Sequence, residues 1–117
     1  MANTVTLLAD HKGYTRPRVM GDEYMVDASI DIQTYSAPEV VTAASLGLSK
    51  INRAVITRIG GGQQKHSFNL VGGPDNANNL YIEVNVEDGT SGIEAELAGS
   101  DASLDGTPII VRVYGLI

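Results

Sequence analysis

The sequence contains no cysteine and no tryptophan, and its only aromatic residues are five tyrosines and one phenylalanine. Without cysteine there is no disulfide framework, no thiolate metal site and no cysteine nucleophile. The redox compartment stays open, because a chain without cysteine folds equally well under reducing and oxidising conditions. The shortage of aromatic side chains also argues against the exposed stacking platforms on which sugar-binding and single-strand-binding modules rely.

Positive charge is scarce as well. Eight Lys and Arg residues face fourteen Asp and Glu residues, which gives a net charge of −6. An acidic domain without a basic stripe repels phosphate backbones, so we expect no nucleic-acid partner. No apolar run approaches the roughly 20 residues that a membrane helix needs, and the first residues lack the pattern of a signal peptide. We therefore expect a soluble chain without a membrane partner, made in a cytoplasm.

Glycine is abundant, with 13 residues, while charged residues make up only 19% of the chain. This composition is typical of short strands joined by tight turns rather than of amphipathic helices. A length of 117 residues fits one domain with a single core. We expect one β domain over residues 1–117, in which residues 1–12 are compatible with an extended N-terminal arm.

The longest alternating segment runs from Tyr24 to Tyr35 and predicts a strand with one apolar and one polar face. Its apolar face would carry Tyr24, Val26, Ala28, Ile30 and Ile32. The other segments with strand character are residues 5–8, 14–20, 51–59, 65–71, 80–86, 93–98 and 107–114.

Three details of these segments predict how the strands are arranged. Pro17 cannot donate to a ladder and favours an edge position. Residues 51–59 have apolar side chains on both faces, which favours a central strand. Short loops between the last three segments favour an antiparallel meander. A single helical turn is expected over Thr42–Leu46, closed by Gly47.

Together these segments predict an all-β fold of about eight short, mainly antiparallel strands. No helix is long enough for the crossover that a parallel sheet requires. The fold class is therefore a single β-sandwich or small barrel, jelly-roll-like in character.

None of the candidate motifs has the sequence context that its chemistry requires. Gly60–Gly62 is followed by strand-like residues instead of the helix that a phosphate loop needs. His11 and His66 are too few to fill a histidine metal set, and no nucleophile elbow is present. The acidic residues concentrate late in the chain but fit no calcium-loop template: Glu83, Glu87, Asp88, Glu94, Glu96, Asp101 and Asp105. We assign no catalytic, cofactor-binding or metal-ligating residue and expect no enzyme.

The most distinctive stretch runs from Tyr35 to Ile51, where an alternating strand ends in Tyr, a Thr-Ala-Ala-Ser-Leu-Gly-Leu corner follows, and a new strand begins. With its flanks, over residues 23–52, it resembles small virion structural proteins of tailed bacteriophages. The resemblance implies a non-enzymatic protein without cofactors that decorates and stabilises the capsid surface of the virion. Its partners would be the major capsid protein and further copies of itself, with a trimer favoured at local three-fold sites.

Other functions share this kind of fold and stay open at this stage. A tail or baseplate accessory component and a carbohydrate-binding β-sandwich module are the main alternatives. A small jelly-roll hydrolase would need a metal cluster or paired carboxylates in a cleft. The apolar Leu116 and Ile117 suggest a surface that is covered by a partner or another copy.

Overall fold

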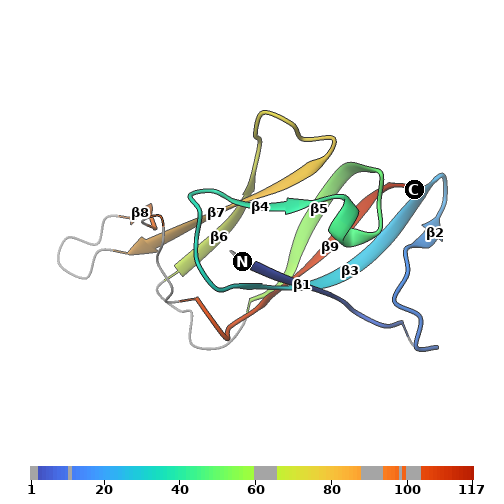
Figure 1. The fold of residues 1–117 in the computed structure, drawn as a ribbon, viewed down its shortest axis with the longest axis horizontal. Coiled ribbons are helices and arrows are strands. Elements are labelled where there is room, and N and C mark those ends of the chain that lie inside the picture. Colours follow the sequence, from blue (N-terminus) through green and yellow to red (C-terminus); the bar gives the residue numbers. More distant parts are fainter. Residues whose placement is uncertain (1–2, 11, 60–65, 88–93, 98, 100–103) are drawn as a thin grey trace.

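The computed structural model describes residues 3–10, 12–59, 66–87, 94–97, 99 and 104–117. Over these residues the chain folds into nine strands, arranged in two antiparallel sheets, and one short 3₁₀ turn (Figure 1). The all-β prediction is confirmed. Two separate sheets enclose one core, so of the two predicted architectures the chain adopts the sandwich.

The first sheet contains five strands in the order β1-β3-β9-β5, with β2 paired to one end of β3. Their bounds are β1 Asn3–Leu7, β2 Arg18–Met20, β3 Glu23–Ile32, β5 Lys50–Ile59 and β9 Ile109–Leu116. The second sheet has the order β4-β7-β6, with β8 paired to the far end of β7. Its strands are β4 Glu39–Thr42, β6 His66–Val71, β7 Asn79–Glu87 and β8 Glu94–Glu96.

The core lies between the inward faces of the two sheets. On β3, the predicted apolar face is confirmed, because Val26, Ala28, Ile30 and Ile32 are all buried. From the second sheet, Val84 and its neighbours on β7 pack into the same cluster. This burial of apolar area on both inner faces is the main force that holds the sheets together.

The turn between β4 and β5 matches its prediction closely. A 3₁₀ turn, η1, spans Ala44–Leu46, and Gly47 closes it with a φ of 77°. This left-handed conformation suits glycine, whose backbone has no Cβ to clash. The buried Leu46 anchors the turn in the core.

Two predictions about the strands are corrected, and one strand was not predicted. Residues 51–59 belong to β5, which ends the first sheet instead of lying in its centre. The last three strands do not form a meander, because β8 pairs with β7 whereas β9 inserts between β3 and β5 in the opposite sheet. The sequence patterns also failed to indicate β4, a short strand that follows a cis peptide bond between Ala37 and Pro38.

Part of the N-terminal segment, which on its sequence alone is compatible with an extended arm, forms β1. Asn3 to Leu7 pair antiparallel with Ile32 to Ala28 of β3, and Val5 and Leu7 pack partly against the core. β1 is thus an edge strand with a modest apolar contribution. Within the described part of the chain, no helix is long and apolar enough to cross a membrane.

Candidate functional site

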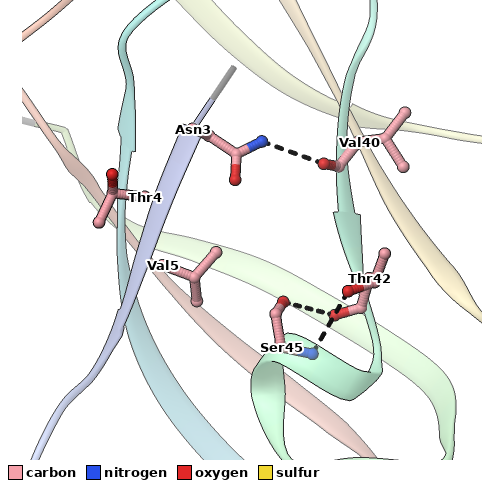
Figure 2. A pocket seen from close by; sticks show the side chains of 6 residues that line it. All are labelled: Asn3, Thr4, Val5, Val40, Thr42 and Ser45. Carbon is pink, nitrogen blue, oxygen red and sulfur yellow. Dashed lines mark hydrogen bonds between the residues drawn. The ribbon is translucent and has the colours of Figure 1, made fainter. Parts of the chain in front are cut away.

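A groove lies where the edge strand β1 of the first sheet runs beside β4 of the second sheet and beside the turn η1 (Figure 2). Its volume is about 310 Å³, and its lining is neutral: Asn3, Thr4, Val5, Val40, Thr42 and Ser45. The groove therefore offers hydroxyl and amide groups beside two valines, but no ionised side chain.

The four polar side chains of the groove already take part in hydrogen bonds within the chain. Asn3 Nδ2 donates to the Val40 carbonyl over 3.1 Å, and Ser45 Oγ donates to the Thr42 carbonyl over 2.7 Å (Figure 2). Thr42 Oγ1 accepts from the Ser45 amide, and Thr4 Oγ1 accepts from Gln33 Nε2. A ligand in the groove would have to compete with these bonds, which weakens its case as a binding site.

A buried carboxylate stands directly beside this groove. Glu39 has no exposed surface, although its strand β4 is otherwise short and half-exposed. Its Oε1 accepts from the Ser36 amide and the Ser36 hydroxyl, both over 3.1 Å, and its Oε2 accepts from Asn3 Nδ2. These bonds satisfy the carboxylate and tie β1 to β4 across the seam between the sheets.

We expect Asn3→Ala to destabilise the protein by about 1–3 kcal/mol, because it removes the donor to Oε2 of the buried Glu39. Chemical denaturation would measure this loss, and hydrogen exchange would show faster exchange of the β1 amides. Thr4→Ala is the matched control, since Thr4 is exposed and bonded only at the surface. Equal stability of the two variants would contradict the role assigned to Glu39.

A second buried polar group lies at the other end of the second sheet. Tyr35 is fully buried, and its hydroxyl donates to Glu96 Oε2 over 2.7 Å while it accepts from the Val84 amide over 3.1 Å. Burial, followed by the hydrogen bond to Glu96, raises the pKa of Tyr35 to about 12. The phenol thus links the segment after β3 to β7 and β8, and its raised pKa keeps it un-ionised near neutral pH.

The raised pKa of Tyr35 predicts an alkaline loss of stability. Between pH 10 and about 12 the unfolded chain loses the phenolic proton while the folded chain keeps it, so the free energy of unfolding falls as pH rises. We expect Tyr35→Phe to be less stable than the wild type by about 1–2 kcal/mol at neutral pH. The gap between the two proteins should shrink above pH 10 in urea titrations. A gap that stays constant would show that the phenol is not held in its neutral form.

Ion pairs cover the outer face of the first sheet. Asp27 on β3 accepts from Arg112 Nε over 2.8 Å and Nη2 over 3.2 Å, and from Arg18 Nη2 over 3.3 Å. The same pairing with Asp27 raises the pKa of Arg112. Arg18 and Arg112 therefore compensate one carboxylate across three strands, a surface network of modest stabilising value.

A second group on this face involves β5. Glu23 accepts hydrogen bonds from Asn52 and Arg53, and the Arg53 guanidinium carbon lies 4.5 Å from the centre of the Tyr114 ring. These contacts fix Arg53 on the outer face, with its side chain still 62% exposed.

Exposed apolar side chains lie along the β5 edge of the first sheet. Val55 is 48% exposed, Ile59 is 46% exposed, and Leu116, which pairs with Lys50 at the start of β5, is 40% exposed. We call these three residues the β5 strip. Val55 and Leu116 lie on the outer face of the sheet, whereas Ile59 pairs with the buried Ile109 and lies on the opposite face. Apolar surface is therefore exposed on both faces at this edge, which is the kind of surface that partners cover.

The residues weighed in the sequence do not converge on one site. His66 is half-buried at the start of β6, whereas His11 and Gly60–Gly62 lie outside the described residues. Glu83 accepts from Asn85, and Glu96 accepts from Tyr35.

The remaining acidic residues are also dispersed. Glu87 and Glu94 are register partners in the pairing of β7 with β8, Asp105 is exposed in a turn, and Asp88 and Asp101 lie outside the described residues. In the described ranges, no three His, Cys, Asp or Glu side chains are grouped so that they could hold a metal ion. Sequence reasoning missed the two buried groups, Glu39 and Tyr35, because neither stands in a recognisable motif.

No protein-family model, curated protein or solved structure matches this chain.

Proposed function

We propose that this chain is a non-enzymatic structural protein of a tailed-bacteriophage virion, which decorates and stabilises the capsid through contacts with the major capsid protein. The observation that carries the proposal is the β5 strip: Val55 and Ile59 on the outermost strand of the first sheet, and Leu116 on the neighbouring β9, stay exposed. A protein that acts as cement needs a rigid core and an uncovered edge of this kind.

The segment that resembles virion proteins leads directly to this edge. Residues 23–52 cover β3, the cis-Pro38 corner, β4, η1 and the start of β5, so they join both sheets. Under this proposal the segment is architectural: it positions β5 without supplying a binding residue of its own. Homo-oligomers, with a trimer favoured, and a place on the capsid surface belong to the same proposal.

Quantitative mass spectrometry of purified particles from the source of this chain tests the proposal. Capsid decoration requires hundreds of copies per particle. A handful of copies would assign the chain to the tail or baseplate, and its absence from particles would overturn the virion assignment altogether.

A carbohydrate-binding role is the second candidate, and the groove between β1 and β4 is the observation that favours it. Its neutral hydroxyl and amide lining matches the hydroxyl groups of a sugar. A glycan array with the purified protein tests this role. A uniformly blank array would remove it, and a signal that survives Thr42→Val and Ser45→Ala would place the sugar elsewhere.

A further inference from the structure

β5 has an edge that no strand of the described chain occupies, although at its start the Ile51 amide donates to the Ala77 carbonyl over 2.7 Å. The strand has ten residues, pairs with β9 on one side, and ends the order of the first sheet. Such an edge carries backbone donors and acceptors that are available to an extended segment of another chain.

The charge of this strand differs in sign from that of the rest of the protein. β5 contains Lys50, Arg53 and Arg58 and no acidic residue, so its formal charge is +3. The net charge of the whole chain is −6, which leaves −9 for the remaining residues. Two β5 strands paired with each other would bring like charges together, so this edge disfavours self-pairing and favours an acidic partner.

The pairing with β9 shows which side chains an added strand would meet. Arg53, Val55 and Arg58 pair with Tyr114, Arg112 and Ile110, and so share the outer face of the sheet. Ala54 and Ile56 pair with the buried Val113 and Val111 and so face the core side.

Irregularities in the pairing limit how much of β5 can take a new partner. The register shifts between Ile51 and Arg53 and again between Ile56 and Arg58. Bulges bend a strand and hinder long, flat edge-to-edge pairing. Residues 53–56 pair regularly, and Arg58 follows after one residue, Thr57, that the register skips. A partner segment that keeps the register of β9 would therefore be short, with five residues from Arg53 to Arg58.

We propose that β5 receives a short extended segment of a partner protein with the pattern acid–x–apolar–x–acid, added as a strand at the edge of the first sheet. One acid lies opposite Arg58, and the other shares the Arg53 guanidinium with Glu23. The apolar residue covers Val55, and the x positions lie on the same side as Ala54 and Ile56. This inference rests on the proposed function only in taking the partner to be a protein. It names the chemistry of the segment that this edge recognises.

Salt screening determines whether a segment bound at β5 senses the nearby charges or the net charge of the whole protein. The Debye length is about 10 Å at roughly 0.1 M salt, so a bound segment senses mainly the charges next to β5 rather than those of the opposite sheet. Of these charges, Arg53 is already paired with Glu23, whereas no ion pair among the described residues involves Arg58. Cross-strand pairs of opposite charge supply the discrimination, and backbone pairing supplies sequence-independent affinity.

The test is an NMR titration of the full chain with the capped peptide TETVTET at about 0.1 M salt. We expect shifts confined to the amides of β5 and the adjoining part of β9, weakening as salt is added. The peptide TKTVTKT should bind at least about fivefold more weakly, because like charges then face each other across the strands.

Arg58→Glu is the decisive variant, since Arg58 is exposed and its reversal leaves the core untouched. Binding of TETVTET should weaken about fivefold or more in this variant. Lys12→Glu is the matched control with the same change in net charge at an exposed site away from β5, and it should bind as the wild type does. Equal binding of both peptides, equal affinities of the two variants, shifts outside β5, or no shift at millimolar peptide would each overturn the inference.

The outcome is separable from that of the proposed function. If the chain is present in hundreds of copies per virion but does not bind TETVTET, its capsid role stands and the inference about β5 is overturned. If the chain binds the peptide but is absent from virions, β5 still recognises an acidic segment, but the capsid role is overturned. Light scattering that shows salt-sensitive self-association lost in Arg58→Glu would identify a second copy as the occupant instead, and would overturn the assignment to a separate partner.

Discussion

Ile30→Asp is expected to leave the protein largely unfolded at neutral pH. Ile30 is 1% exposed in the middle of β3, paired with Val5 on one side and Ile109 on the other. The substitution removes a buried aliphatic side chain and places an unpaired carboxylate in the core, which together cost about 4 kcal/mol or more. That is most of the stability of an ordinary small domain. Circular dichroism and urea denaturation would measure the loss.

Thr6→Asp is the matched control for this change. Thr6 lies on β1, one position along from the partner of Ile30, and its side chain is exposed. The same charge placed there meets water, so we expect a change within about 0.5 kcal/mol. If Ile30→Asp melted at the wild-type temperature, the assignment of the inner face of β3 would be wrong.

Gly115→Ala is expected to destabilise the protein by about 3 kcal/mol or more. Gly115 lies on β9 between Tyr24 of β3 and Ile51 of β5, where the backbones of neighbouring strands approach closely. A Cβ at this position would overlap the backbone carbonyl of Lys50, which cannot move aside as a flexible side chain would. The end of β5 would have to separate from β9, and thermal denaturation would record the loss.

Gly72→Ala controls for the loss of glycine flexibility in itself. A Cβ on Gly72 would meet only the side-chain amide of Asn76, at an ordinary contact distance of 3.8 Å. We therefore expect this variant to stay within about 0.5 kcal/mol of the wild type. Similar losses in both variants would contradict the close approach at Gly115.

The sequence predicted those parts of the fold whose pattern is local and regular. β3 alternates without interruption from Val26 to Ile32, so the order of these residues alone indicates which face is buried. The 3₁₀ turn is equally evident, because Gly47 marks its end. β4 escaped prediction since it has only four residues, starts after Pro38 and carries a buried Glu39 where a carboxylate is normally exposed.

β5 was placed wrongly for a physical reason. Its two register shifts change the phase of the alternation, so a strict period of two across residues 51–59 groups the inward Ile51 with the outward Val55, and the inward Ile56 with the outward Arg58. Apolar residues then fall on both faces of the expected strand, which is the pattern of a central strand. The meander failed for a different reason, since the pairing of β9 with β3 depends on contacts that span most of the chain.

Some features of the candidate site are also predictable from the sequence alone, whereas others depend on how the strands are arranged. The scarcity of chemical motifs is evident in the composition, whereas the burial of Glu39 and Tyr35 depends on which strands meet in space. The basic character of β5 follows directly from the sequence of its ten residues. That this strand ends a sheet, and so presents its charges to a partner, depends on the topology.

The position of β9 also bears on how the protein is made. In the described sheets, β3 and β5 share no direct ladder and are joined only through β9, which is synthesised after the other eight strands. Until residues 109–116 have left the ribosome, both neighbours expose a long unpaired edge, and the first sheet is split into two halves. Vectorial synthesis therefore cannot complete this domain stepwise. The nascent chain waits for its last strand, and during that interval shielding by chaperones would govern its yield.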